Sequence, residues 1–177
     1  MLPVLVVTTI EWGERSRIMI LGMTTLTFVH VLLSLIGILS GVIVLLGMFS
    51  SKRMDGMTGL FLATTVLTSV TGFFFPNSKV TPGIVLGVLS LIALAIAIYA
   101  RYIRKMAGGA RSAYVITAVI SEYFNVFVLI AQAFMKVPAL HALAPTGPEP
   151  PFLIAQVVCM VIFIVLTVGA VKKFHPA

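Results

Sequence analysis

The sequence predicts an all-α membrane protein, a single transmembrane domain over residues 1–177 that folds as a five-transmembrane-helix bundle. Of its 177 residues, 60% are hydrophobic and only 10% are charged, whereas charged residues make up about 25% of an ordinary soluble domain. The mean hydropathy is +1.16. The charges flank long apolar runs, and a run of about 20 helical residues crosses a hydrocarbon core of ~30 Å.

The first two runs predict the first two helices. No charged residue occurs between Arg17 and Lys52, so we expect a helix near 20–49, long enough to tilt or to project from the bilayer. A turn that contains Gly56 separates it from the second helix, which we expect near 57–75.

The remaining helices follow the same rule. We expect them near 82–104, 112–135 and 152–172, and the second of these three holds one charge, Glu122. A Pro-rich outer loop at 137–151 joins the last two helices. A proline-rich turn between two spans is the commoner case, and a lid or a docking surface is the alternative.

Orientation follows from Lys and Arg, which concentrate on the cytoplasmic side of membrane proteins. With the N-terminus outside and the C-terminus in the cytoplasm, eight of these residues lie inside and four outside. The inside set is Lys52, Arg53, Arg101, Arg104, Lys105, Arg111, Lys172 and Lys173. The outside set is Arg15, Arg17, Lys79 and Lys136. Because these positions meet lipid phosphates, we expect membrane lipids and no nucleic acid as partners.

The N-terminal segment Leu2–Ile10 is apolar but too short to span, and it lacks the charged start and the cleavage pattern of a secretory signal. We expect it to lie at the membrane interface, with Trp12 at the outer boundary.

Small residues predict where the helices pack, because lipid gives apolar side chains no reason to prefer one another. Gly37 and Gly41 continue a stripe of small and polar residues along the first helix, and Gly83 and Gly87 repeat the device on the third. These stripes should face the bundle. Such spacing supports packing and carries no information about function.

Glu122 is the most informative residue, because a carboxylate inside a membrane is costly and tends to mark an ion pathway, a proton relay or a partner. Asn125 and Gln132 share its helix face, and Gln156 on the last helix is expected to join the same polar core. Counting from the expected helix ends places Glu122 and His30 both ~15 Å into the bilayer. We therefore expect that the two can meet as a buried pair.

A buried His–Glu pair can hold an exchangeable proton, as a proton-linked carrier or channel-like protein requires. This is our leading functional hypothesis, and so small a protein would need to oligomerise to enclose a pathway. The alternative is a purely structural role, in which Glu122 is neutral and joins helices by hydrogen bonds. The rival function is a non-catalytic accessory or scaffold subunit of a larger membrane complex.

The sequence contains few residues that could hold a cofactor or act in catalysis. Cys159 is the single cysteine, which rules out a zinc site built on paired thiolates. No lysine lies inside an expected span to form a retinal Schiff base, and haem held by His30 and a methionine is the third hypothesis. Without a nucleophile, metal set or phosphate loop, we expect no enzyme and no cofactor.

One segment carries a resemblance: EYFN at 122–125, QAF at 132–134, KVPAL at 136–140, APT at 144–146 and EPPF at 149–152. It resembles a group of uncharacterised bacterial integral membrane proteins, over the last two helices and their loop. The resemblance implies a multi-pass protein of a bacterial inner membrane and no particular activity.

Overall fold

The computed structural model describes residues 7–8, 19–20, 23–75 and 81–176. Most of the predicted interfacial segment Leu2–Ile10, together with Trp12 and the cations Arg15, Arg17 and Lys79, lies outside these ranges. Three two-residue strands, β1 (Val7–Thr8), β2 (Met19–Ile20) and β3 (Met23–Thr24), pair antiparallel in that order beside the first helix.

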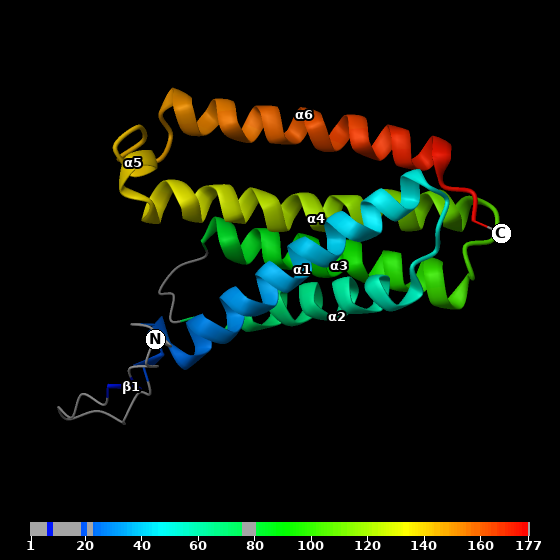
Figure 1. Cartoon of the computed structure of the whole chain (residues 1–177), viewed down its shortest axis with the longest axis horizontal. Helices are drawn as coiled ribbons and strands as arrows, with labels where there is room; N and C mark the ends of the chain where they lie inside the picture. Colours follow the sequence, from blue (N-terminus) through cyan, green and yellow to red (C-terminus); the bar gives the residue numbers. More distant parts are fainter. Residues whose placement is uncertain (1–6, 9–18, 21–22, 76–80, 177) are drawn as a thin grey trace, which may run out of the picture.

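The rest of the described chain is a helical bundle (Figure 1). Its elements are α1 (Thr25–Phe49), α2 (Asp55–Gly72), α3 (Pro82–Ile98), the π-helix η1 (Tyr99–Ile103), α4 (Gly109–Lys136), α5 (Pro138–His141) and α6 (Pro150–Lys173). Each predicted helix is therefore present. The first begins later than expected, and α5 is a short helix that the sequence did not predict.

Four of the described helices are long and apolar enough to cross a membrane: α1, α3 with η1, α4 and α6. The shorter α2 packs with them in the bundle and carries several hydroxyl residues and Asp55. Thr24 caps α1 by accepting from Thr27 N, and Thr81 caps α3 just before Pro82. These caps satisfy amides that would otherwise lack a partner.

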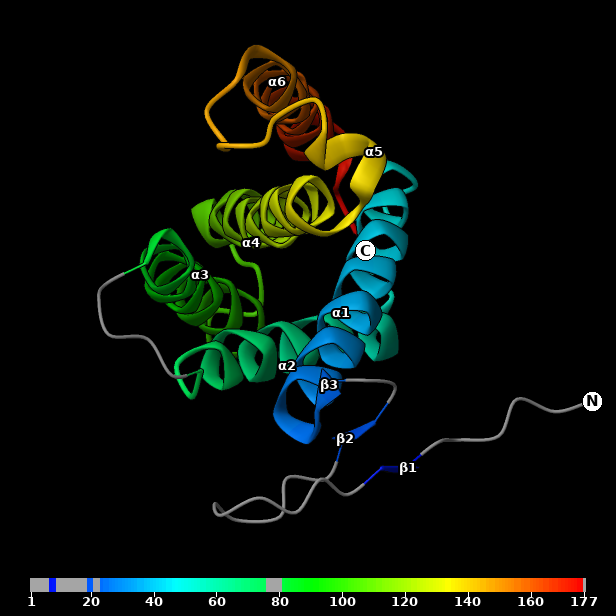
Figure 2. The ribbon, with the colours of Figure 1, turned by 90° about the vertical axis from the view of Figure 1, so that its left-hand side faces the viewer.

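Helix α4 is the centre of the bundle and contacts α1, α3 and α6, while α1 packs most extensively against α2. Figure 2 shows α6 as the outermost helix, lying on α4. Most large side chains of α6 are exposed, including Val165 at 65%. Exposure of that kind is typical of a surface that faces lipid.

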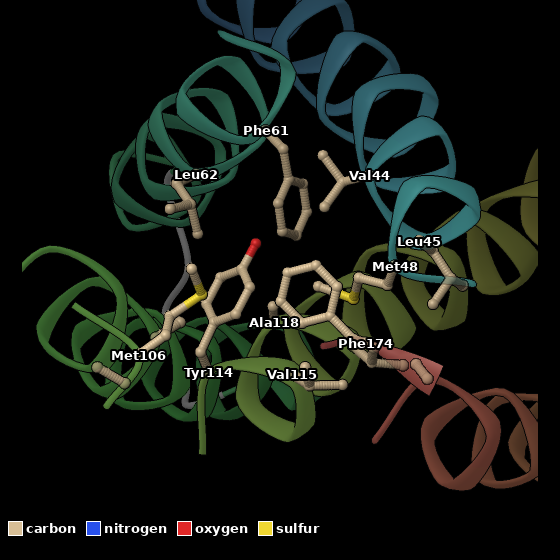
Figure 3. Close-up of a cluster of buried hydrophobic side chains, with 14 of the residues drawn as sticks. Val44, Leu45, Met48, Phe61, Leu62, Met106, Tyr114, Val115, Ala118 and Phe174 are labelled. Carbon is tan, nitrogen blue, oxygen red and sulfur yellow. The ribbon is translucent and has the colours of Figure 1, made fainter. Parts of the chain in front are cut away.

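The hydrophobic core lies in the half of the bundle toward the C-terminus (Figure 3). Tyr114 of α4 sits at its middle, fully buried, and packs against Phe174 of the tail with ring centroids 6.0 Å apart. Around it lie Val44, Leu45, Met48, Phe61, Leu62, Met106, Val115 and Ala118. We call this end, with the turns at 50–54 and 104–108 and the tail, the C-terminal end of the bundle.

Candidate functional site

Glu122 is buried where α4 meets α1, with 2% of its surface exposed. Its carboxyl group lies against Gly41, so closely that a side chain on Gly41 would overlap it. A glycine on α1 therefore makes room for the acid on α4. The predicted packing role of Gly41 has this specific physical cause.

The carboxyl group is poorly satisfied. Neither of its oxygens has a hydrogen-bond partner of ordinary geometry among the described residues. The nearby Asn125 amide donates to Thr65 Oγ1 of α2 at 3.2 Å. A buried polar group without a partner is rare and unfavourable in folded proteins, and inside a bilayer it is more so.

Gly37, one turn before Gly41, lies at the crossing of three helices. A Cβ there would stand 3.2 Å from Thr65 Oγ1, 3.3 Å from Thr64 Oγ1 and 3.7 Å from Asn125 Nδ2. Thr64 donates to its own helix, to Leu60 O at 2.7 Å. Its hydroxyl thus follows the usual back-bonding pattern of threonine in helices. The crossing is consequently polar but locally satisfied, except at Glu122.

The predicted pairing of His30 with Glu122 is wrong. His30 Nδ1 bonds Thr71 Oγ1 of α2 at 2.9 Å, and its ring meets the Phe75 ring edge-on. Glu122 lies instead at the level of Gly41, which is eleven residues further along α1, or about 16 Å at 1.5 Å per residue. The two ionisable groups occupy different levels of the bundle.

Other predicted residues divide among different contacts. Gln156 Nε2 donates to Phe127 O at 3.1 Å and thereby joins α6 to α4, away from the Gly41 contact. Gly87 lies against Phe73 at the end of α2, whereas a Cβ on Gly83 would meet the local Thr81 hydroxyl at 3.7 Å. Gln132 is half-buried on α4. Of the predicted polar core, the structure brings together Glu122 and Asn125.

Burial changes sharply along the face of α4 that carries Glu122. Toward the C-terminal end, Val115, Ala118 and Val119 are fully buried. Toward the other end, Asn125 and Gln132 are only half-buried. Helix α1 shows the same change, because its buried residues begin at Gly37. Glu122 therefore lies at the boundary between a closed half and a looser half of the bundle.

Arg101 is a buried cation that sequence reasoning missed. Only 1% of its side chain is exposed, and Nη2 donates to Asp55 Oδ1 at 2.6 Å and to Arg53 O at 2.8 Å. Its guanidinium also lies 4.9 Å from the centre of the Tyr114 ring, within the range of a cation–π contact. One signal was present, since Arg101 precedes the boundary residues Arg104 and Lys105 by one helical turn.

The segment between α5 and α6 has its own small network. Glu149 Oε1 accepts from Thr146 N at 2.9 Å and from Thr146 Oγ1 at 2.6 Å. The bond from the Thr146 hydroxyl holds the pKa of Glu149 below its ordinary value of 4.5. The predicted Pro-rich loop is thus partly ordered, and with α4 and α6 it lines an apolar pocket of about 540 Å³.

Within the part of the chain that the structure describes, no three His, Cys, Asp or Glu side chains gather closely enough to hold a metal ion. No family model, curated protein or solved structure matches the chain.

Proposed function

We propose that the protein spans a bacterial inner membrane five times, with the N-terminus outside, and acts as a proton-linked carrier whose proton-binding group is Glu122. The fifth span in this proposal is α2, whose 18 residues extend about 27 Å as a helix. The polar face of α2 packs inside the bundle against α1, which relieves the cost of its hydroxyl groups in lipid.

The observation that carries the proposal is the buried carboxyl group of Glu122, whose oxygens have no hydrogen-bond partner of ordinary geometry among the described residues. A carboxyl group in such a position responds to any change in its surroundings, because water or a nearby cation favours its ionised form and a dry helix contact favours its neutral form. Alternating access in a carrier supplies such a change. Gly41 gives the site a direct link to the position of α1.

The burial boundary at Glu122 supports access from one side. The half of the bundle toward the C-terminal end is filled by apolar core, which opposes proton passage there. On the other side, the half-buried Asn125 and Gln132 continue the polar face toward the end where His30 lies. We infer that this structure corresponds to a state closed to the cytoplasm.

The test is proton flux in liposomes that contain the full-length protein. We expect Glu122→Gln, which keeps the shape of the side chain, to lower flux at least tenfold, and His30→Ala to lower it less because His30 does not contact Glu122. Glu149→Gln is the matched control, since it removes a carboxylate from the loop. Equal flux in the wild type and Glu122→Gln, above empty vesicles, would overturn the proposal.

The long exposed face of α6 favours a second candidate, an accessory subunit of a larger membrane complex. An apolar helix with few buried residues suits docking against another membrane protein as well as it suits lipid. Wild-type flux no greater than that of empty vesicles, together with a stable monomer in detergent, would favour this candidate over the carrier.

A further inference from the structure

Three segments that lie far apart in the sequence are fastened together at the C-terminal end of the bundle. Ser51 Oγ, in the turn between α1 and α2, donates to Lys173 O at 2.7 Å and accepts from His175 N at 2.8 Å. Arg111 at the start of α4 donates to Val171 O at 2.9 Å and also to Phe174 O. We call the contact of Ser51 with the tail the Ser51 junction.

The junction fixes the backbone positions of its lysines. Ser51 adopts a positive φ of 54°, and the next residue, Lys52, donates its amide to Gly47 O at 2.9 Å. Lys173 extends its ammonium group over the Phe49 ring, 5.8 Å from the centroid. Two basic segments, one from the turn and one from the end of α6, are therefore held side by side.

These lysines have no acidic partner among the described residues. Six exposed cations lie at this end: Lys52, Arg53, Arg104, Lys105, Lys172 and Lys173. The acid nearby is Asp55, which pairs with Arg101 at 2.6 Å and with Arg53 at 3.6 Å. Among the described residues, Lys52, Lys172 and Lys173 consequently have no acid that compensates their charge.

Apolar surface adjoins this charge along the helix axes. Leu46 on α1 is 63% exposed and Val165 on α6 is 65% exposed, each about two turns before the basic residues. Charge at the helix ends with apolar side chains beneath it matches a lipid, whose phosphate lies at the surface and whose chains lie in the core. A free anion would use the charge alone.

We propose that the lysines at the Ser51 junction, Lys52, Lys172 and Lys173, bind the phosphate headgroup of an anionic phospholipid. The Ser51 junction fixes the backbone segments that carry these lysines before the lipid arrives, so that less conformational entropy is lost on binding. This inference is independent of the carrier proposal, because it concerns a different end of the bundle and needs no transport.

The experiment measures binding of phosphatidylglycerol and phosphatidylcholine to the full-length protein in neutral detergent. We expect the triple variant Lys52→Gln/Lys172→Gln/Lys173→Gln to bind phosphatidylglycerol at least tenfold more weakly, since one lysine near an anionic surface is worth roughly fivefold in affinity. The matched control, Arg104→Gln/Lys105→Gln/Lys136→Gln, removes three exposed charges outside the Ser51 junction, two of them at the same end of the bundle, and should lose less than threefold.

Ser51→Ala distinguishes a specific binding site from general attraction to positive charge, because it removes the hydrogen bonds of the Ser51 junction and keeps every cation. We expect it to weaken phosphatidylglycerol binding severalfold, and the triple Lys→Arg variant to retain binding. Equal losses in the two triple variants, or no loss in Ser51→Ala, would overturn the proposal. Competition by inorganic phosphate at the same concentration as the lipid would overturn the assignment to a lipid.

Discussion

The carboxyl group of Glu122 on α4 occupies the space that a Cβ on Gly41 of α1 would need, so the two helices make close contact at this pair of residues. The contact makes the approach of the two helices depend on two residues at once. Glycine permits the close crossing, and the acid fills the space that glycine leaves. Each residue constrains what can replace the other.

Gly41→Ala should therefore destabilise the protein by about 1–3 kcal/mol through overpacking, as measured by thermal or SDS-induced unfolding. The cost should fall by at least about 0.5 kcal/mol in a Glu122→Ala background, because the clashing group is then gone. Gly59→Ala on α2 is the control, since a Cβ there meets nothing within 4 Å and alanine favours helix. Additive costs in the double variant would contradict this account of the contact.

Asp55→Asn should lower the free energy of unfolding by roughly 2 kcal/mol or more, because it leaves the fully buried Arg101 without a carboxylate. Arg101→Met should cost less, since the side chain of Asp55 is 67% exposed and can be solvated when its partner is gone. The same unfolding measurement, with the exposed Arg104→Met as control, decides the order. A larger loss in Arg101→Met would show that stacking on Tyr114 outweighs the ion pair.

His30 should carry a proton on Nδ1. The Thr71 hydroxyl has one proton and donates it to Leu67 O at 2.8 Å, so it can only accept from the imidazole. Nitrogen-15 NMR of the labelled protein should show a protonated Nδ1, and Thr71→Val should shift that resonance. An Nδ1 lone pair in the wild type would mean that Thr71 turns its hydroxyl toward the ring.

The turn closed by Glu149 should loosen in acid. Because the pKa of Glu149 is lowered in the folded chain, the stabilisation is present above its ordinary value of 4.5 and is lost as pH falls through the lowered value. Hydrogen exchange at the Thr146 amide, corrected for its intrinsic rate, should show protection that disappears over that interval. In Glu149→Gln the protection should be weaker and independent of pH there.

Sequence patterns predicted the helices well, because long apolar runs between charges leave few other structures in a membrane. They predicted α1 less well at its start. Residues 19–20 and 23–24 pair as strands and Thr24 caps the helix, so His30 lies only five residues, or about 8 Å, from the beginning of α1. That shorter distance removes the depth argument that had placed His30 level with Glu122.

The sequence identified Glu122 as the candidate site residue, but it did not predict which residues surround Glu122 in the bundle. Intramembrane charge singled out Glu122, but the rotation of each helix about its axis decides what faces it, and apolar periodicity is weak when lipid surrounds most of the surface. Gly41 was expected to pack and was not linked to the acid. Arg101 was counted as a cation at the membrane boundary. The direction of its side chain depends on the π-helix η1, which no local sequence pattern predicted.

The π-helix η1 has one further consequence. Its turn, closed by Arg104 N donating to Tyr99 O at 3.0 Å, accommodates one residue more than an α-turn over the same rise. Deleting a single residue there would restore regular winding and leave the direction of the chain beyond it nearly unchanged, whereas the residues inside the turn, Arg101 among them, would shift around the axis. The alignment of the guanidinium with Asp55 and Tyr114 thus depends on a register offset, and chain length in this short stretch matters as much as amino-acid identity.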